Sequence, residues 1–227
     1  AAALRNGETV SGDWFVLAVP HHRVAQLVPE PLQRDAQLSG LARLETAPIS
    51  SVHLWFDREI TSLPHAVFVG RLSQWLFNRS VLLQADHAPQ DEVAHRQYSY
   101  QVVISASGGL LNRPRREVID AVVDELGEIW PIARQARLTH SRLVTEQKAV
   151  CSPLPGSEEY RPVQQSPIPN LQFAGDWTQT GWPSTMEGAV RSGYLAAENI
   201  LAGARRPERL LKPDLTVAFL SRVLLRL

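Results

Sequence analysis

The sequence predicts a mixed α/β fold in two parts, and three observations support this prediction. Two short apolar runs, residues 14–19 and 171–174, have the composition of buried strands and stand near opposite ends of the chain. Several segments between them alternate apolar and polar residues, as strands with one buried face do. Two segments, 114–130 and 184–201, have the apolar spacing of amphipathic helices. At 227 residues the chain is long enough for one large domain or two small ones.

The composition excludes several classes of protein. An apolar content of 44% and a charged content of 20% are typical of globular proteins. Lysine plus arginine equals aspartate plus glutamate, 23 each, so no overall field attracts nucleic acid. The single cysteine, Cys151, excludes an internal disulfide and a cysteine-built metal site, and we interpret it as an inert thiol near a strand end. The histidines lack metal-ligand spacing, no run approaches the about 18 apolar residues of a membrane span, and the N-terminus lacks a signal-peptide pattern.

Residues 1–44 predict a hairpin, a strand and short helices, in that order. Asn6-Gly7 is a turn dipeptide within the hairpin. The run 14–19 suits a strand buried on both faces. Residues 21–44 alternate helical spacing with prolines, which predicts short surface helices leading into a second domain.

The middle of the chain predicts a sheet and one helix. Strand patterns cover residues 48–57, 99–107 and 138–150, and residues 63–78 predict two short strands with a turn near Gly70-Arg71. The helix at 114–130 is expected to be capped by Asn112, ended by Pro131, and apolar at Val118, Ile119, Val122, Leu126 and Ile129. The polar segment 81–98 contains carboxylates and histidines, yet its composition favours a solvated loop.

Four side chains of the predicted sheet invite a functional interpretation. His53 is interpreted as a packed strand histidine rather than a general base. The aromatic residues Phe68, Trp75 and Phe77 fit either the wall of an apolar substrate tunnel or ordinary core packing.

The segment 170–201 joins a strand to a loop and a long helix. Ser184 followed three residues later by Glu187 predicts a capping box at the start of the helix, and Gly203 predicts its C-terminal cap. A helix N-terminus beside a strand end, with Asp176 between them, is the geometry of a ligand site in an α/β sheet. An ordinary strand-loop-helix unit explains these features equally well, and the capping box alone explains Glu187.

The run AGDWTQTGWPSTMEGAVRSGYLAAENI resembles the C-terminal flavin-binding segment of the flavin amine oxidase and phytoene desaturase superfamily. The resemblance implies FAD as the cofactor, with Asp176 near its ribityl or pyrophosphate portion. It implies that N–H groups around Thr185 and Met186 lie near the flavin pyrimidine edge. The cofactor-binding residues expected on this basis are Gly175, Asp176, Trp182, Pro183, Thr185, Met186, Glu187 and Ala189. Arg161 would face a phosphate or flavin edge, or form a surface or interdomain ion pair.

Two further segments, PISSVHLWFD and LPHAVFVGRLSQWLFN, resemble the squalene-associated group, the hydroxysqualene dehydroxylases of hopanoid biosynthesis. This resemblance implies that reduced flavin replaces the hydroxyl of hydroxysqualene, a long isoprenoid, with hydride. No Asp, Glu or His stands in a motif that singles out a catalytic residue. Three alternatives stay open: a phytoene-type desaturase, an amine oxidase with Trp177 and Trp182 as aromatic walls, and a non-catalytic half-chain.

In this family a G-x-G-x-x-G motif holds the dinucleotide, and this sequence lacks one. The resemblance therefore implies the C-terminal half of an enzyme: a partial FAD-binding Rossmann-like domain plus a mixed-sheet substrate domain, which needs an N-terminal half as partner. The expected division is residues 1–20 and 161–203 for the flavin part, 21–160 for the substrate part, and 204–227 for a tail.

The tail carries apolar residues at helical spacing together with Lys212, Arg222 and Arg226. It predicts either an interfacial helix on anionic lipid or a terminal helix docked on the protein. The expected location is the cytoplasm, with peripheral contact at the inner membrane face.

Overall fold

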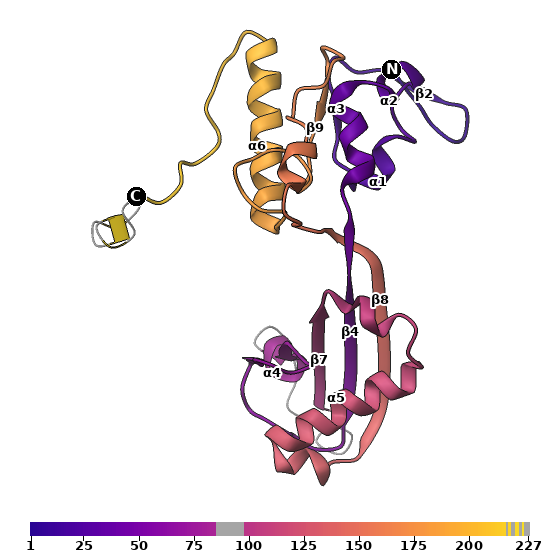
Figure 1. Cartoon of the computed structure of the whole chain (residues 1–227), viewed down its shortest axis with the longest axis vertical. Helices are drawn as coiled ribbons and strands as arrows, with labels where there is room; N and C mark the ends of the chain where they lie inside the picture. Colours follow the sequence, from indigo (N-terminus) through magenta and orange to yellow (C-terminus); the bar gives the residue numbers. More distant parts are fainter. Residues whose placement is uncertain (85–97, 217, 219–220, 223, 225–227) are drawn as a thin grey trace. The chain divides into compact units, whose positions relative to one another are not determined.

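The structure, a computed structural model, describes residues 1–84, 98–216, 218, 221, 222 and 224 (Figure 1). The chain divides into two compact units, Ala1–Glu45 with Cys151–Leu227, and Thr46–Val150. The expected boundaries at residues 20 and 160 are therefore displaced. Residues 21–45 and 151–160, expected in the substrate part, lie in the first unit.

The first unit contains two small sheets. Strands β1 (Ala2–Ala3) and β2 (Thr9–Val10) form the predicted hairpin, with Gly7 at a φ of 86° in its turn. Strands β3 (Phe15–Leu17) and β9 (Leu171–Phe173) pair in parallel, which confirms that the two ends of the chain meet in one sheet. The expectation that β3 is buried on both faces is wrong, because the Val16 side chain is 48% exposed.

Four short helices follow β3: α1 (His21–Val24), α2 (Glu30–Gln33), α3 (Ala36–Ser39) and the 3-10 helix η1 (Gly40–Arg43). The helices are where the sequence predicts them, but they do not serve as a surface connection. Their apolar residues pack with β9 and with Trp177 in the core of the first unit, which comprises Val24, Val28, Leu32, Leu38, Leu41, Leu44, Cys151, Phe173 and Trp177.

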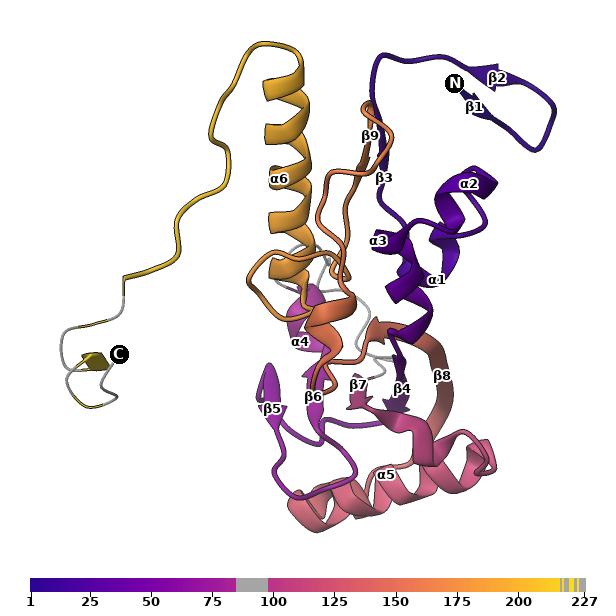
Figure 2. The ribbon, with the colours of Figure 1, turned by 45° about the horizontal axis from the view of Figure 1, so that its top comes forward.

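Helix α6 (Met186–Gly203) lies beside β9 in the first unit (Figure 2). We expected its packed face to comprise Ala189, Gly193, Ala196 or Ala197, and Ile200. The buried residues are instead Gly188, Arg191, Ser192 and Ala196. Gly193 has open space around its α-carbon, so the buried face is rotated by about one residue from the expected one.

The second unit is a five-stranded sheet in the order β5-β6-β7-β4-β8. Its strands are β4 (Thr46–Phe56), β5 (His65–Val67), β6 (Trp75–Asn78), β7 (Tyr98–Ser105) and β8 (Leu138–Cys151), which confirms the predicted strands. The pairs β4–β7, β6–β7 and β5–β6 are antiparallel. Helix α4 (Arg79–Gln84) follows β6, whereas the 3-10 helix η5 (Ser157–Tyr160), which follows β8 in the chain, belongs to the first unit.

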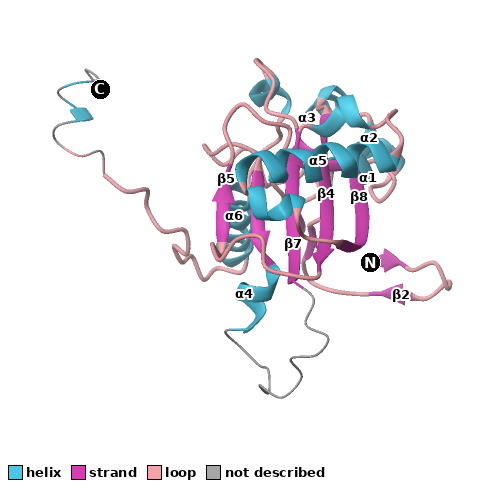
Figure 3. Ribbon diagram, turned by 90° about the horizontal axis from the view of Figure 1, so that it is seen from below, coloured by secondary structure: helices cyan, strands magenta, loops and turns pink. Residues whose placement is uncertain are grey.

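Helix α5 (Arg115–Ile129) crosses one face of this sheet (Figure 3). Its buried residues Val118, Ile119, Val122 and Leu126 are the predicted apolar face. The predicted cap at Asn112 is wrong: Pro114 is the N-cap residue and no side chain caps the helix. The core beneath α5 comprises Val52, Leu54, Phe56, Ile60, Leu76, Tyr100, Val102, Ile104 and Ala133 with these four residues.

Two expectations fall wholly or partly outside the described residues. Residues 85–97 contain most of the predicted polar loop, and the predicted tail helix includes residues 217, 219, 220, 223 and 225–227. Among the described residues, no helix is both long enough and apolar enough to span a bilayer.

Candidate functional site

The carboxyl end of β9 meets the N-terminal half of α6 through a glycine. The N–H of Gly175 donates to Oγ of Ser192 at 2.7 Å, and this hydroxyl donates to the carbonyl of Ala189 at 2.6 Å. Gly175 has a φ of 151°, and a Cβ there would stand 2.2 Å from Nε1 of Trp177. Only glycine fits this junction, because any side chain would displace the buried indole.

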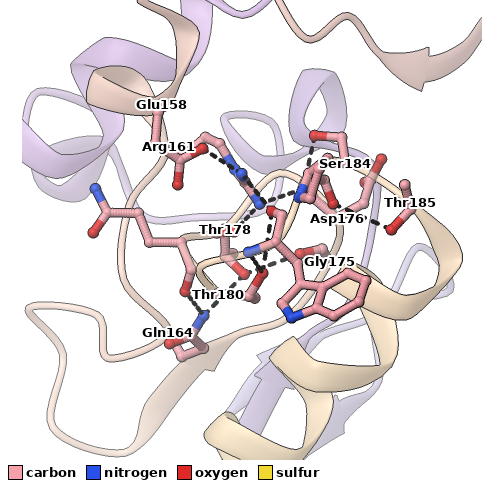
Figure 4. A network of polar contacts seen from close by, with 12 residues as sticks. Glu158, Arg161, Gln164, Gly175, Asp176, Thr178, Thr180, Ser184 and Thr185 are labelled. Atoms are coloured by element: carbon pink, nitrogen blue, oxygen red, sulfur yellow. Dashed lines mark hydrogen bonds and ion pairs between the residues drawn. The ribbon is translucent and has the colours of Figure 1, made fainter. Parts of the chain in front are cut away.

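Arg161 organises the loop between β9 and α6 (Figure 4). Its guanidinium donates to the carbonyl oxygens of Asp176 at 3.0 Å, Thr178 at 2.5 Å and Trp182 at 2.9 Å, and it pairs with the carboxylate of Glu158. Arg161 is only 5% exposed. Arg161 therefore forms an ion pair, as one of the two alternatives predicted, but its partner lies within the first unit. Most N–H donors of this arginine bind main-chain carbonyls rather than face a cofactor.

Gln164 holds the same loop from a second position. Its Nε2 donates to Oγ1 of Thr178 at 3.0 Å and to the carbonyl of Gln179 at 2.6 Å. No motif in the sequence singles out Gln164 or Thr178. Loop-holding residues of this kind carry no motif, because any donor at the right place can hold a carbonyl.

The start of α6 differs from the predicted capping box. Thr185 is the N-cap residue, and its hydroxyl accepts from the N–H of Gly188 at 3.2 Å. Ser184 instead donates to the carbonyl of Asp176 at 2.9 Å. Glu187 consequently lies one position too early for a capping box, and its carboxylate stands 3.4 Å from Arg191 one turn along the helix.

Two kinds of polar group remain available for a ligand here. Within the described part of the chain, no hydrogen bond or ion pair reaches the carboxylate of Asp176, and none reaches the N–H groups of Met186 and Glu187. The N–H of Ala189 is used, because it donates to the carbonyl of Thr185 at 2.9 Å. An acceptor at a strand end next to open donors of a helix N-terminus suits a ligand with hydroxyls and an electron-rich edge.

Trp182 and Pro183 line a pocket of about 400 Å³ within the first unit, together with Leu154, Glu158, Arg161 and Ser184 among others. Trp182 is 37% exposed, whereas Trp177 is fully buried and donates its indole N–H to the carbonyl of Val19 at 2.7 Å. The two tryptophans thus differ in role. Trp177 is a core residue, and an aromatic wall could be formed by Trp182 alone of the two.

Cys151 ends β8 and is buried with a free thiol. Burial raises the pKa of this thiol, which agrees with the interpretation of Cys151 as inert. No group of His, Cys, Asp or Glu side chains in the described ranges could hold a metal ion.

Comparison with known proteins shows which family of proteins this chain is similar to. The family model of the flavin-containing amine oxidoreductases matches residues 1–201. A 15-cis-phytoene desaturase of Solanum lycopersicum is 30% identical over 208 aligned residues, covering 87% of this chain and 34% of that protein. A 15-cis-phytoene desaturase of Synechococcus elongatus is 29% identical over 205 residues, covering 86% of this chain and 41% of that protein.

Among solved structures, the cyclohexylamine oxidase of Brevibacterium oxydans has a TM-score of 0.61 at 16% identity, covering 85% of this chain and 43% of that one. This is a likeness of fold. The chain spans about a third to two fifths of the length of the curated relatives named above.

Proposed function

Because the chain belongs to the family of flavin-containing amine oxidoreductases, whose cofactor is FAD, we propose that it acts in the reductive dehydroxylation of hydroxysqualene to squalene. The relatives named above are phytoene desaturases, so a long isoprenoid is a substrate class found among its relatives. The finer choice of hydroxysqualene rests on the resemblance of the segments PISSVHLWFD and LPHAVFVGRLSQWLFN.

One observation supports the cofactor site above all: a carboxylate and the N–H groups of a helix start lie near each other, and neither has a hydrogen-bond partner in the described part of the chain. The carboxylate of Asp176 can accept hydrogen bonds from ribityl hydroxyls. The N–H groups of Met186 and Glu187, at the positive end of α6, can donate to the electron-rich edge of the flavin ring. The residues present therefore fit FAD, and Gly175, Trp182, Pro183 and Thr185 shape the surrounding loop.

When bound, FAD would supply the redox chemistry: hydride from its reduced form together with a proton would replace the hydroxyl group, giving hydrocarbon, water and oxidised flavin. This chain contributes binding and orientation. Arg161 and Gln164 fix the loop 176–182, and Thr185 fixes the first turn of α6, so the donors at the helix start are positioned before the cofactor binds.

An apolar substrate is supported by the sheet face that lies opposite α5. Trp75 and Phe77 stack there with ring centroids 5.9 Å apart and an interplanar angle of 8°, and Trp75 is 41% exposed. Phe68, in contrast, packs edge-on against Trp130 beside the core, with centroids 5.7 Å apart. Of the three aromatic residues considered from the sequence, Trp75 and Phe77 fit a substrate wall, and Phe68 fits core packing.

His53 lies on the same face and is hydrogen-bonded to Oγ of Ser51 at 3.2 Å. Burial, followed by the positive charges of Arg142 and Arg79, lowers the pKa of His53. A half-buried histidine held by a neighbouring serine agrees with the interpretation as a packed residue, and we assign it no catalytic role.

The free edge of β3 supports the need for a further part of the enzyme. In the parallel register Phe15↔Leu171, the N–H and C=O of Val16 point away from β9. Parallel sheets of two strands are rare on their own. We propose that this edge pairs with a strand of the dinucleotide-binding half that the family resemblance implies.

A carotenoid-type desaturase is the second candidate, and the named relatives favour it. It would use the same flavin in the oxidative direction. An amine oxidase is less well supported, since Trp177 is buried and cannot form one of two aromatic walls. A non-catalytic half-chain is the third candidate.

The deciding experiment is an FAD titration of the purified chain, followed by assays of hydroxysqualene with reduced flavin and of phytoene with oxidised flavin. Retained flavin with squalene as product supports the proposal. Desaturated products from phytoene, without squalene formation, would replace it by the second candidate. Flavin binding without either conversion, in the presence of the dinucleotide-binding half, would favour the non-catalytic candidate.

A further inference from the structure

The chain after α6 turns back along the helix. Arg205 takes a φ of 59° just beyond the helix end, and residues 205–216, which we call the return segment, then run from the C-terminal end of α6 towards the level of its start (Figure 1). The family match ends at residue 201. The contacts of the return segment are therefore features of this chain that the family model does not include.

The first anchor of the return segment is Glu198. Its carboxylate accepts the N–H groups of Leu210 and Leu211, both at 2.7 Å. These two backbone hydrogen bonds lower the pKa of Glu198. They hold the return segment against the last two turns of α6.

The second anchor is Asp214, and it reaches the candidate site. Its Oδ1 accepts the indole N–H of Trp182 at 2.9 Å and stands 3.0 Å from a guanidinium nitrogen of Arg191. The same guanidinium lies 5.4 Å from the centroid of the Trp182 ring. Asp214 thus ties together the pocket-lining tryptophan, the second turn of α6 and the return segment.

The return segment buries little apolar surface of its own. Apart from the half-buried Leu210 and Leu211, its residues are exposed, and Leu215 is 97% exposed. Polar contacts with α6 and Trp182 are what hold it in place. Such half-exposed contacts are individually weak and are weakened further by salt.

We infer that the return segment is a releasable strap, in which Asp214 is a positioning residue that fixes Trp182 at the pocket and slows the release of the cofactor. This inference rests on the proposed function, in which the loop 176–182 and the start of α6 hold FAD. When Asp214 leaves, Trp182 loses its indole partner and the loop loses its contact with the return segment. The cofactor then dissociates more readily.

Trypsin reports the release of the return segment directly. The bond between Arg209 and Leu210 is cleavable by trypsin, and its N–H is one of the two held by Glu198. The bonds after Arg206 and Lys212 precede prolines and resist trypsin, and cleavage after Arg205 gives a fragment of different mass that is scored separately. Cleavage after Arg209 therefore measures how often the return segment leaves α6.

The experiment compares the full chain with Asp214→Ala, Glu198→Gln and the control Asp124→Asn, an exposed carboxylate on α5 without a described partner. We expect cleavage after Arg209 to be about two- to fivefold faster in the first two variants, the effect of losing half-exposed contacts, and unchanged in the control. We also expect FAD to slow this cleavage in the parent chain. An unchanged cleavage rate in Asp214→Ala would contradict the inference that Asp214 holds the return segment in place.

A double-mutant cycle tests whether Asp214 acts through Trp182. Asp214→Ala should weaken FAD binding about two- to fivefold in the parent, and clearly less in a Trp182→Phe background, where the indole donor is already absent and only the contact with Arg191 remains. Additive effects, or equal FAD affinity of the parent and Asp214→Ala, would overturn the positioning role. The FAD measurements are made with the dinucleotide-binding half present. If the parent chain then binds no FAD at saturating concentration, the proposed cofactor site itself fails, and the positioning role falls with it, whereas the trypsin comparison still tests the strap.

Discussion

The indole of Trp14 lies against the α-carbon of Gly203, the last residue of α6. A Cβ at Gly203 would stand 2.4 Å from Cη2 of Trp14 and 2.6 Å from Cζ2. Trp14 directly precedes β3, so this contact fixes the end of α6 to the beginning of the parallel sheet. We expected Gly203 to be a C-cap, whereas the structure requires a glycine there for close packing.

Replacing Gly203 by alanine is therefore expected to destabilise the first unit by ~1–3 kcal/mol, because the added methyl group displaces a packed indole. Gly193→Ala is the matched control on the same helix: its Cβ would meet nothing within 4 Å, so we expect a gain of ~0.5–1 kcal/mol from helix propensity. Denaturant unfolding of both variants measures the difference. Equal stability of the two variants would contradict the close approach of Trp14.

The sequence predicted elements better than it predicted their ends and packed faces. Apolar periodicity located β4, β7, α5 and α6, because periodicity reflects which side of an element is buried. The caps at Asn112 and Ser184 were misplaced, since several polar residues stand near each helix start and only the backbone turn selects one. Arg161 and Asp214 were beyond prediction in their present roles, because their partners are main-chain carbonyls and a distant indole that no local pattern specifies.

Glu125 on α5 should make the second unit sensitive to acid. Its carboxylate accepts the N–H of Leu72 at 2.9 Å and that of Ser73 at 2.8 Å. Although burial by itself would raise its pKa, these backbone hydrogen bonds and the charge of Arg71 hold the pKa of Glu125 below its ordinary value. A lowered folded-state pKa contributes stability above the unfolded-state pKa, and this stability is lost as the pH falls through the folded-state value.

We accordingly expect Glu125→Gln to be less stable than the parent at neutral pH, and the difference to shrink as the pH falls below the ordinary carboxyl range of about 4.3. Denaturant unfolding at neutral and acidic pH measures this. Asp124→Asn, at the neighbouring exposed position, is the control for charge alone. A stability difference that stays constant with pH would show that the carboxylate charge is not what these N–H groups require.

Arg161→Lys should be strongly destabilising despite the retained charge. A lysine ammonium cannot reach the carbonyls of Asp176, Thr178 and Trp182 at once, as the planar guanidinium does. We expect the free energy of unfolding to fall by ~3 kcal/mol, because buried carbonyls lose their donors and the ion pair with Glu158 is weakened. Thermal unfolding compared with Arg5→Lys, an exposed control in the same unit, checks this; similar melting temperatures would mean that water replaces the guanidinium.

Asp176→Ala tests the cofactor site without disturbing the fold. Because the carboxylate of Asp176 has no hydrogen bond or ion pair in the described part of the chain, its removal should leave the unfolding midpoint unchanged. If it accepts ribityl or pyrophosphate-side hydrogen bonds, the FAD dissociation constant should rise about ten- to hundredfold, the effect of losing hydrogen bonds to a charged group. Asp176→Asn keeps one acceptor oxygen, so its FAD dissociation constant should lie between those of the parent and Asp176→Ala.

Asp13→Ala, an exposed carboxylate in the same unit, is the control and should bind FAD like the parent. Flavin fluorescence titration measures all four proteins under one condition. Unchanged affinity in Asp176→Ala would refute the ribityl or pyrophosphate assignment and leave the N–H groups of Met186 and Glu187 as the remaining candidate contacts. Weaker binding with an unchanged unfolding midpoint would support a direct ligand contact, because no hydrogen bond or ion pair in the described residues involves this carboxylate.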